Sequence, residues 1–366
     1  MDATPQHARE TPLRDVETKL GATFATWFGC EMPERFTSFD EEYRFARETA
    51  ALVDRNYRAF LYLTGADRER YLNAILTNNV RAAIPGRGVP SLLLNPQGHI
   101  LAELEIYSLG DRHLAISYRM IRERLIEALD RYIIMDDVAI EDATESLVAL
   151  GVEGPKSAEV LRSVSGEELE SFAELEMREA RVGEMPARIL RRSPGGVPGF
   201  ECIGERASAD ALWNLMLDAV GAAGGGPIGY EALNSLRLEA GVPWFGYDYD
   251  EGVIPHEARL ESTHISFTKG CYTGQEIVER VRSRGHVNRM RVGLEFSGTA
   301  IPERGAKLTV GDKEVGHVTR AGYSPRAGHA IGIGYLRREH AATGSVVEFA
   351  GVPATVIELP IDKVDR

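Results

Sequence analysis

The run Lys269-Gly270-Cys271-Tyr272-Thr273-Gly274-Gln275-Glu276 combines a helix start with a cysteine in the setting of a reactive thiol. Thr273 and Glu276 have the spacing of a capping box, in which each side chain satisfies a backbone donor at a helix start. The sequence therefore predicts a helix from Gly274 to about residue 283. Cys271 would lie before the positive end of that helix and near Lys269, and both charges favour a thiolate.

Reactivity of Cys271 depends on its exposure. A lone cysteine is commonly a small buried hydrophobic residue, and the residues around this one leave both interpretations open. The chain has three cysteines, Cys30, Cys202 and Cys271, with no Cys-x-x-Cys pair. Their number and spacing fit neither a disulfide framework nor a zinc site, and they favour a reducing compartment. We therefore expect no metal.

Upstream of the run, hydrophobic periodicity predicts an α+β fold. Residues 1–20 are polar, and we expect them to be frayed. Residues 37–54 have helical spacing, with Ser38 as a plausible N-cap. Strands and helices then follow in a ferredoxin-like order and again in a second copy. The first copy comprises 59–63, 67–76, 91–94, 99–108, 113–117, 119–132 and 138–140, and the second comprises 147–152, 155–164, 187–191, 200–203 and 207–220.

Downstream of the run, the chain changes character. A helix is predicted over 229–240, and short strands with Gly and Pro turns dominate after Gly285. These strands predict a small β-barrel, and they comprise 291–296, 307–310, 314–319, 331–335 and 346–349. We divide the chain into an N-terminal lobe, a second lobe that carries the run, and a barrel, at 1–145, 146–285 and 286–366.

Composition excludes several classes of protein. The 366 residues carry a net charge of −13, so direct nucleic-acid binding is not expected. The polar N-terminus has no apolar core of a signal peptide, and no apolar run is long enough to span a membrane. These features predict a soluble, cytoplasmic protein.

The run Lys269–Glu276 resembles the signature Lys-Gly-Cys-Tyr-x-Gly-Gln-Glu of YgfZ-type folate-binding proteins, in the superfamily of the glycine cleavage T protein (GcvT). In the T protein itself, the corresponding segment has no cysteine. The resemblance covers nearly the whole chain and implies lobes around a central tetrahydrofolate channel. Further segments that resemble the superfamily lie at residues 21–24, 29–33, 95–100, 199–201, 236–241, 322–325 and 331–332.

The resemblance also implies site residues. It assigns Cys271 as catalytic and Glu201, Arg237, Lys269 and Tyr272 as contacts of the folate. Glu201 matches the glutamate that binds the pterin, and a carboxylate can accept paired hydrogen bonds from such a ring. Without the resemblance, Glu201 would be interpreted as a solvent-facing strand residue.

Arg237 has two interpretations that the residues leave open. It resembles an arginine that clamps the glutamate of folate or a core carboxylate, and arginine suits either task. It could equally form an ion pair with Glu231 or Glu239, on or near its own helix.

The early hairpin departs from the T protein. Where that family has two aspartates, one of which assists chemistry at the folate nitrogen, this chain has Ala102 and Glu103. Alanine cannot hold a proton or a charge. Glu103 is displaced by one position, so on a strand it would point to the opposite face. This departure disfavours aminomethyl transfer.

Two other groups of residues are interpreted as solvated. Asp248, Asp250, His256 and His264 match no standard metal-ligand spacing, and a loop of exposed charges explains them. The arginines between 280 and 291 form a basic stretch, which we interpret as a solvated helix face, the alternative being a docking surface for an anion such as a polyglutamate tail.

Taken together, the resemblance implies a tetrahydrofolate-binding protein that supports iron–sulfur cluster assembly or repair in client proteins, including tRNA-modifying enzymes, with Cys271 acting near the folate. The alternative is a folate-dependent aminomethyltransferase of the glycine cleavage type, and a third possibility is a binding module without chemistry. Whether the chain is an enzyme stays open; if it is one, we expect a one-carbon or aminomethyl transferase.

Overall fold

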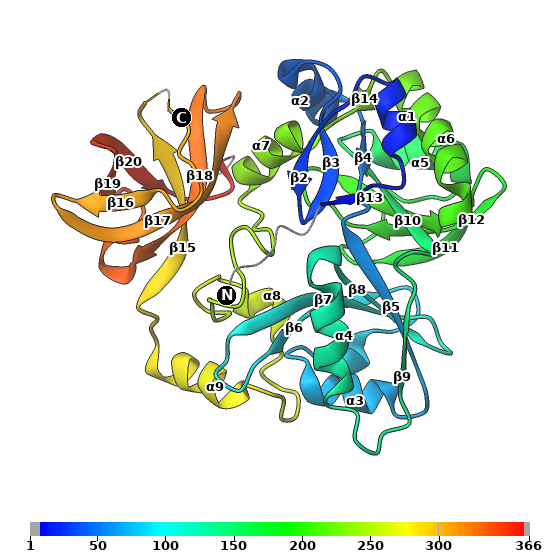
Figure 1. The fold of residues 1–366 in the computed structure, drawn as a ribbon, viewed down its shortest axis with the longest axis horizontal. Coiled ribbons are helices and arrows are strands. Elements are labelled where there is room, and N and C mark those ends of the chain that lie inside the picture. Colours follow the sequence, from blue (N-terminus) through cyan, green and yellow to red (C-terminus); the bar gives the residue numbers. More distant parts are fainter. Residues whose placement is uncertain (1–7, 299, 362–366) are drawn as a thin grey trace.

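The computed structural model describes residues 8–298 and 300–361. It has three groups of elements, with α7 (Tyr230–Ala240) and α8 (Glu261–His264) between them (Figure 1). A barrel lies on one side, and two sheets with their helices lie on the other. The predicted α+β fold with a C-terminal barrel is confirmed. The proposed residue limits of the lobes stay a prediction.

The first sheet is antiparallel and is built from the first predicted strand–helix repeat. Strand β7, which lies between β6 and β8, alternates apolar residues with Glu103, Glu105 and Tyr107, which therefore share one face. Helices α3 (Arg68–Ile75) and α4 (Arg122–Asp130) belong to the same part of the chain. The strand order is β6 (Gly88–Leu94), β7 (Ile100–Ser108), β8 (His113–Tyr118), β5 (Arg58–Thr64) and β9 (Ala139–Asp142).

The second sheet takes most of its strands from residues 147–227 and one from earlier in the chain. Helices α5 (Ser157–Ser165) and α6 (Ala209–Ala222) accompany it. The strand order is β11 (Met177–Val182), β12 (Met185–Arg191), β13 (Gly199–Glu205), β10 (Leu147–Glu153), β4 (Ala51–Asp54) and β14 (Gly226–Pro227).

Strand β4 corrects the expected helix over 37–54. Helix α2 ends at Glu48, and Ala51–Asp54 pair with β10 as a completely buried strand. A short apolar run fits a helix and a buried strand equally well, so periodicity could not decide between them. The start of the helix was predicted correctly, because the Ser38 hydroxyl accepts a hydrogen bond from the Glu41 amide at 3.3 Å.

The two sheets meet through their side chains. Phe60, Tyr107, Leu114 and Ile116 of the first sheet form one apolar cluster with Ala149, Met177, Leu190 and Ile203 of the second. On β7 and β13, the residues that continue these faces are charged: Glu105 and Glu103 follow Tyr107 toward the strand's start, and Glu201 precedes Ile203. The junction is therefore apolar in one part and charged in the other.

Residues 8–20 contain a strand and a helix, so the expectation of a frayed stretch is wrong for them. Residues 1–7 lie outside the described part. Leu13 is completely buried, and the guanidinium of Arg14 lies 3.7 Å from the ring centre of Phe24. The elements are β1 (Arg9–Glu10), α1 (Arg14–Lys19), β2 (Thr23–Trp27), β3 (Cys30–Arg35) and α2 (Phe39–Glu48).

A carboxyl of this segment makes stability depend on pH. Glu17 is fully buried beside Asp54, and burial together with the Asp54 charge raises its pKa to about 10. A group whose pKa is higher in the folded state stabilises the fold below its unfolded pKa of 4.5 and loses that contribution as the pH rises toward 10.

We therefore expect Glu17→Gln to be more stable than the wild type at about pH 8, by roughly 2–4 kcal/mol, with a much smaller gain at about pH 5. Thermal unfolding of both proteins at the two pH values measures the difference. An equal difference at both values would show that Glu17 is ionised in the fold.

The C-terminal strands close into a barrel. The predicted strands at 307–310 and 346–349 have the limits of β16 and β19. The sequence interpretation missed β20, whose Pro353 lowers strand propensity at that position. The barrel order is β15 (Arg289–Phe296), β18 (His329–Arg337), β17 (Lys313–Ser324), β16 (Lys307–Val310), β19 (Val346–Phe349) and β20 (Val352–Ile357).

The helix of the signature run is α9 (Gln275–Arg284), but its start differs from the predicted capping box. The N-cap is Gly274, not Thr273, and no side chain caps it. Gly274 has a φ of +82°, and a Cβ there would lie 2.7 Å from the Asn95 carbonyl oxygen, so only glycine fits. Four 3-10 turns complete the described elements: η1 (Val80–Ala82), η2 (Arg119–Ile121), η3 (Arg206–Ser208) and η4 (Arg338–His340).

In the described ranges, no helix is long and apolar enough to cross a membrane. The cytoplasmic location stays a prediction from the sequence.

Candidate functional site

Glu201 lies at the charged part of the junction between the sheets. Its carboxylate is 1% exposed and accepts a hydrogen bond from Arg55 Nη1 at 3.1 Å through Oε2. The second oxygen, Oε1, lies 3.4 Å from Arg58 Nε but accepts no hydrogen bond from any described residue. A buried carboxylate oxygen without a donor is costly, and a ligand with N–H groups would satisfy it.

Two arginines neutralise this carboxylate and link the sheets. Arg58 of β5 donates to Glu105 Oε2 at 2.9 Å, and Arg55 donates to Glu153 of β10. Arg55 lies against Gly151, where a Cβ would be 2.3 Å from its Nε, so a larger residue there would displace the guanidinium. Burial opposes ionisation of Glu105, but Arg58 and Arg192 keep its pKa below the usual value. These paired charges hold the geometry around Glu201.

Glu103 lies on the same face of β7 as Glu105. Its Oε2 accepts from the Tyr118 hydroxyl at 2.9 Å, and its Oε1 lies 3.0 Å from His264 Nε2. Burial alone would raise its pKa, but the hydrogen bond and the charge of His264 lower it to about 2. Ala102, by contrast, lies in the apolar core of the first sheet. The carboxylate at position 103 therefore faces the charged junction and stays ionised.

His264 and Asp248 are buried, at 7% and 1% exposure, so their interpretation as solvated loop charges was wrong. His264 ends α8, and its Nδ1 lies 2.7 Å from the Thr263 hydroxyl. Its partner Glu103 is 161 residues away in the sequence, which spacing along the chain could not reveal. In the described ranges, no group of three or more His, Cys, Asp or Glu side chains could hold a metal ion.

Arg237 is completely buried, and its carboxylate partner is Asp248 rather than Glu231 or Glu239. Asp248 also accepts hydrogen bonds from the Trp244 amide at 2.8 Å and from the Thr319 hydroxyl of the barrel at 2.7 Å. As a clamp, Arg237 was expected to bind either the glutamate of folate or a core carboxylate, and in the structure it binds a core carboxylate. A contact with folate stays a prediction.

Aromatic side chains form the surroundings of Glu103, and the sequence interpretation missed them. Phe28 stacks on Tyr57 with ring centres 4.2 Å apart and on Tyr118 at 5.5 Å. Tyr118 is also the donor to Glu103, so the rings and the acid meet there. Phe28 has a φ of +51°, and its amide donates to the Tyr247 hydroxyl at 2.9 Å. Strained backbone conformations cluster at active sites and ligand-binding sites.

Lys269 is bound to the backbone of the chain by hydrogen bonds. Its ammonium donates to the carbonyl oxygens of Asn73, Leu76 and Asn78, at the end of α3, and burial lowers its pKa to about 8. Tyr272 is buried, with the ammonium of Lys269 5.1 Å from its ring centre, and burial raises the pKa of its hydroxyl. Folate contacts of both residues stay predictions.

Cys271 is exposed, whereas Cys30 and Cys202 are buried. Burial raises the pKa of the Cys30 thiol to about 11 and that of Cys202 to about 12. Only Cys271 therefore meets the condition of exposure that its predicted reactivity required. Its catalytic role stays a prediction.

We expect one thiol per chain to react with a disulfide reagent in the native protein, because the other two are buried and protonated. Titration of the wild type and of Cys271→Ser, before and after denaturation, measures the number. A native Cys271→Ser protein that still reacts at the same rate would show that a buried thiol becomes accessible.

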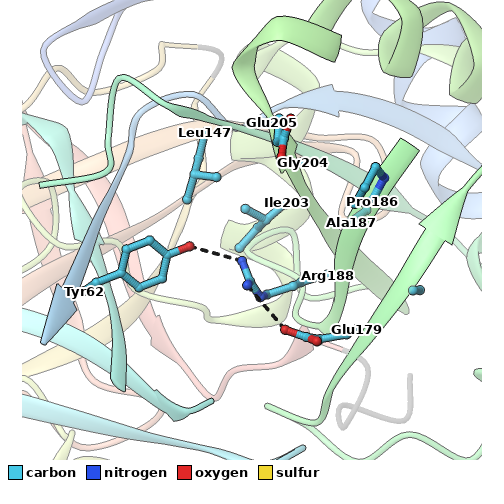
Figure 2. A pocket seen from close by; sticks show the side chains of 10 residues that line it. Tyr62, Leu147, Glu179, Pro186, Ala187, Arg188, Ile203, Gly204 and Glu205 are labelled. Atoms are coloured by element: carbon cyan, nitrogen blue, oxygen red, sulfur yellow. Dashed lines mark hydrogen bonds and ion pairs between the residues drawn. The ribbon is translucent and has the colours of Figure 1, made fainter. Parts of the chain in front are cut away.

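A separate pocket of about 340 Å³ lies at the apolar junction of the sheets (Figure 2). Figure 2 shows Arg188 between Tyr62 and Glu179, to which it donates at 3.2 and 3.3 Å. None of the predicted site residues lines this pocket. Arg188 pairs there with Glu179, and we assign no function to the pocket.

Two family models match the chain. The GCVT N-terminal domain matches residues 13–269, and the glycine cleavage T-protein C-terminal barrel domain matches residues 289–362. In structure, the chain is similar to the glycine cleavage system aminomethyltransferase T from Bartonella henselae, with a TM-score of 0.87, 24% identity and coverage of 96% and 98% of the two chains. That similarity concerns the fold.

Curated relatives are similar along their whole length. The aminomethyltransferase from Streptomyces coelicolor is 30% identical over 97% of this chain and 98% of its own. The corresponding proteins from Streptomyces avermitilis and Bacillus subtilis are 29% and 28% identical, and the alignments cover 96% and 97% of this chain and 97% and 99% of the relatives.

These relatives overturn the expected main function. A role in iron–sulfur cluster assembly or repair, with iron–sulfur client proteins, was wrong as the first choice, because the relatives are aminomethyltransferases. The alternative that the sequence interpretation ranked second is the better supported one. That ranking rested on the cysteine of the signature run and on Ala102, and it discounted Glu103 because that residue would point to the opposite face of the strand.

Proposed function

Because the chain belongs to the glycine cleavage T-protein family, we propose that it is a tetrahydrofolate-dependent aminomethyltransferase. The observation that carries the proposal is the pair of buried carboxylates, Glu103 and Glu201, at the charged junction of the two sheets. One is ionised and held by Tyr118 and His264, and the other keeps an oxygen without a donor.

The residues present fit a folate. Glu201 Oε1 is the buried acceptor that a pterin amino group and ring N–H would satisfy. Phe28, Tyr57 and Tyr118 supply flat apolar surfaces near the acid. Tetrahydrofolate, when bound, supplies the nitrogen that takes up the one-carbon unit.

Glu103 provides a fixed negative charge. Its pKa of about 2 keeps the carboxylate ionised near neutral pH, so it stabilises positive charge on a reacting amine rather than acting as an acid. Tyr118 and His264 hold its two oxygens in place. Glu103 thereby supplies the negative charge near the reacting amine that the alanine at position 102 cannot supply.

Membership of the family also indicates a partner. We propose that the aminomethyl group arrives on the lipoyl carrier protein of glycine cleavage, the H protein. The run Lys269–Glu276 supports a further placement in a cysteine-bearing branch that resembles YgfZ-type proteins; this placement stays a prediction.

Calorimetric titration with tetrahydrofolate tests the proposal. We expect saturable binding to one site per chain, and we expect Cys271→Ser to bind equally well because no folate contact is assigned to its thiol. Absence of binding to the wild type at about 1 mM tetrahydrofolate, the upper end of typical KM values, would contradict the proposal.

A further inference from the structure

A second cavity lies between the end of α7 and the barrel. It has a volume of about 300 Å³, and Gly241, strand β15 and strand β20 contribute to its walls. Leu238 of α7 packs on Ile331 and Ile333 of β18, with Leu359 against them, and this contact fixes the helix on the barrel. The cavity is separate from Glu103 and Glu201, neither of which lines it.

Two arginines, Arg259 and Arg291, line this cavity. Arg291 donates from Nε to the Ala258 carbonyl at 2.9 Å and from Nη1 to the Gly241 carbonyl at 3.1 Å. Among the described residues, the guanidinium of Arg259 donates only to the Met290 sulfur, at 3.3 Å from Nη2. Among the described side chains, neither guanidinium has a carboxylate within ion-pair distance. Most other arginines in this acidic chain have one.

The surroundings of Arg259 and Arg291 favour the binding of an anion. Burial lowers the pKa of Arg291, so its charge lacks full compensation by the protein. Arg259 has a φ of +55°, a conformation that costs a residue with a Cβ free energy and that recurs at binding sites. Carbonyl oxygens anchor one side of the Arg291 fork, and the remaining N–H groups are suited to a planar anion.

Glu358 also lines the cavity and is the alternative partner. It forms no ion pair with either arginine in the described part of the chain. Two positive charges against one negative charge leave the cavity with a net positive charge. A ligand is therefore a better explanation than internal pairing.

We propose that this cavity binds an anion that carries carboxylate or phosphate groups, through Arg259 and Arg291. The anion is either a free metabolite or the glutamate tail of a folate; only the second source rests on the proposed function. In the turn after α7, Arg237 donates to the Val242 carbonyl and Arg291 donates to the Gly241 carbonyl. An anion bound to Arg291 would therefore fix the turn that orients Arg237.

The probes are citrate, inorganic phosphate and tri-γ-glutamate, measured by calorimetry on the full chain. We expect at least one of them to bind the wild type and Arg259→Gln to weaken it about tenfold, the loss of one charge-assisted contact. Arg259 is exposed, so this variant should fold. Arg338→Gln removes an exposed charge elsewhere on the barrel and should bind as the wild type does.

No binding of any probe at about 10 mM, or equal weakening in the Arg338→Gln control, would overturn the proposal. Tetrahydrofolate with one and with three glutamates separates the sources. If the triglutamate form binds the wild type more tightly than the monoglutamate form, and this difference disappears in Arg259→Gln, the ligand is the folate tail. If the two forms bind with equal affinity while citrate or phosphate still binds, the ligand is a free anion. If tetrahydrofolate does not bind at all, the proposed function fails, while the free probes still test the cavity.

Discussion

Glu103→Gln is expected to lower the rate of aminomethyl transfer about 100- to 1,000-fold, the usual effect of removing one preorganised electrostatic group from an active site. The amide keeps the size of the carboxylate and can still accept from His264 or Tyr118, so the fold should survive. It cannot carry the negative charge that a pKa of about 2 maintains in the wild type. Single-turnover kinetics with saturating substrates measures the change in rate.

The matched control is Glu141→Gln, an exposed glutamate on β9 of the same sheet, which should leave the rate unchanged. Thermal unfolding of both variants checks that they are folded. A Glu103→Gln protein with full activity would show that the charge at position 103 is structural. Another group would then have to stabilise the reacting amine.

Glu201→Gln is expected to weaken tetrahydrofolate binding about 100-fold, since paired hydrogen bonds to a charged acceptor contribute roughly 3 kcal/mol together. The amide retains an oxygen for Arg55 but presents N–H groups where the pterin would donate. Alanine is the poorer choice, because it would leave two buried arginines without this carboxylate. Calorimetry compares the affinities.

Glu205→Gln, on the exposed end of the same strand β13, is the control and should bind as the wild type does. A Glu201→Gln protein with unchanged affinity would mean that Glu201 serves Arg55 and Arg58 only. The carboxylate would then be a structural residue, and the pterin site would lie elsewhere.

Local signals in the sequence predicted the elements well. The barrel strands at 307–310 and 346–349, the helix over 229–240 and the Ser38 N-cap all depend on neighbours in the chain, and they were predicted correctly or nearly so. Thr273 failed as a cap because close packing of Gly274 against the 95–98 hairpin, which is distant in sequence, decided the helix start.

The site was harder to predict because its partners are far apart in sequence. Glu103 and His264, and Arg55 and Glu201, meet only once the sheets pack together. One signal was available: Glu103 and Glu105 alternate with apolar residues in a strand predicted over 99–108. Acids on one face of an otherwise apolar strand need partners when that face is buried. Glu103 was named from the sequence but was discounted because it points away from the face of Ala102, and the face that it shares with Glu105 was not considered.

Transfer of an aminomethyl group to tetrahydrofolate by this chain can be measured directly. The direct measurement supplies tetrahydrofolate and an aminomethylated lipoyl carrier protein to the purified chain, and follows methylenetetrahydrofolate and released ammonia. We expect both products in equal amounts with the wild type, and at least about 100-fold slower with Glu103→Gln. Tight binding of tetrahydrofolate by a folded wild-type protein that forms neither product would contradict the proposed function.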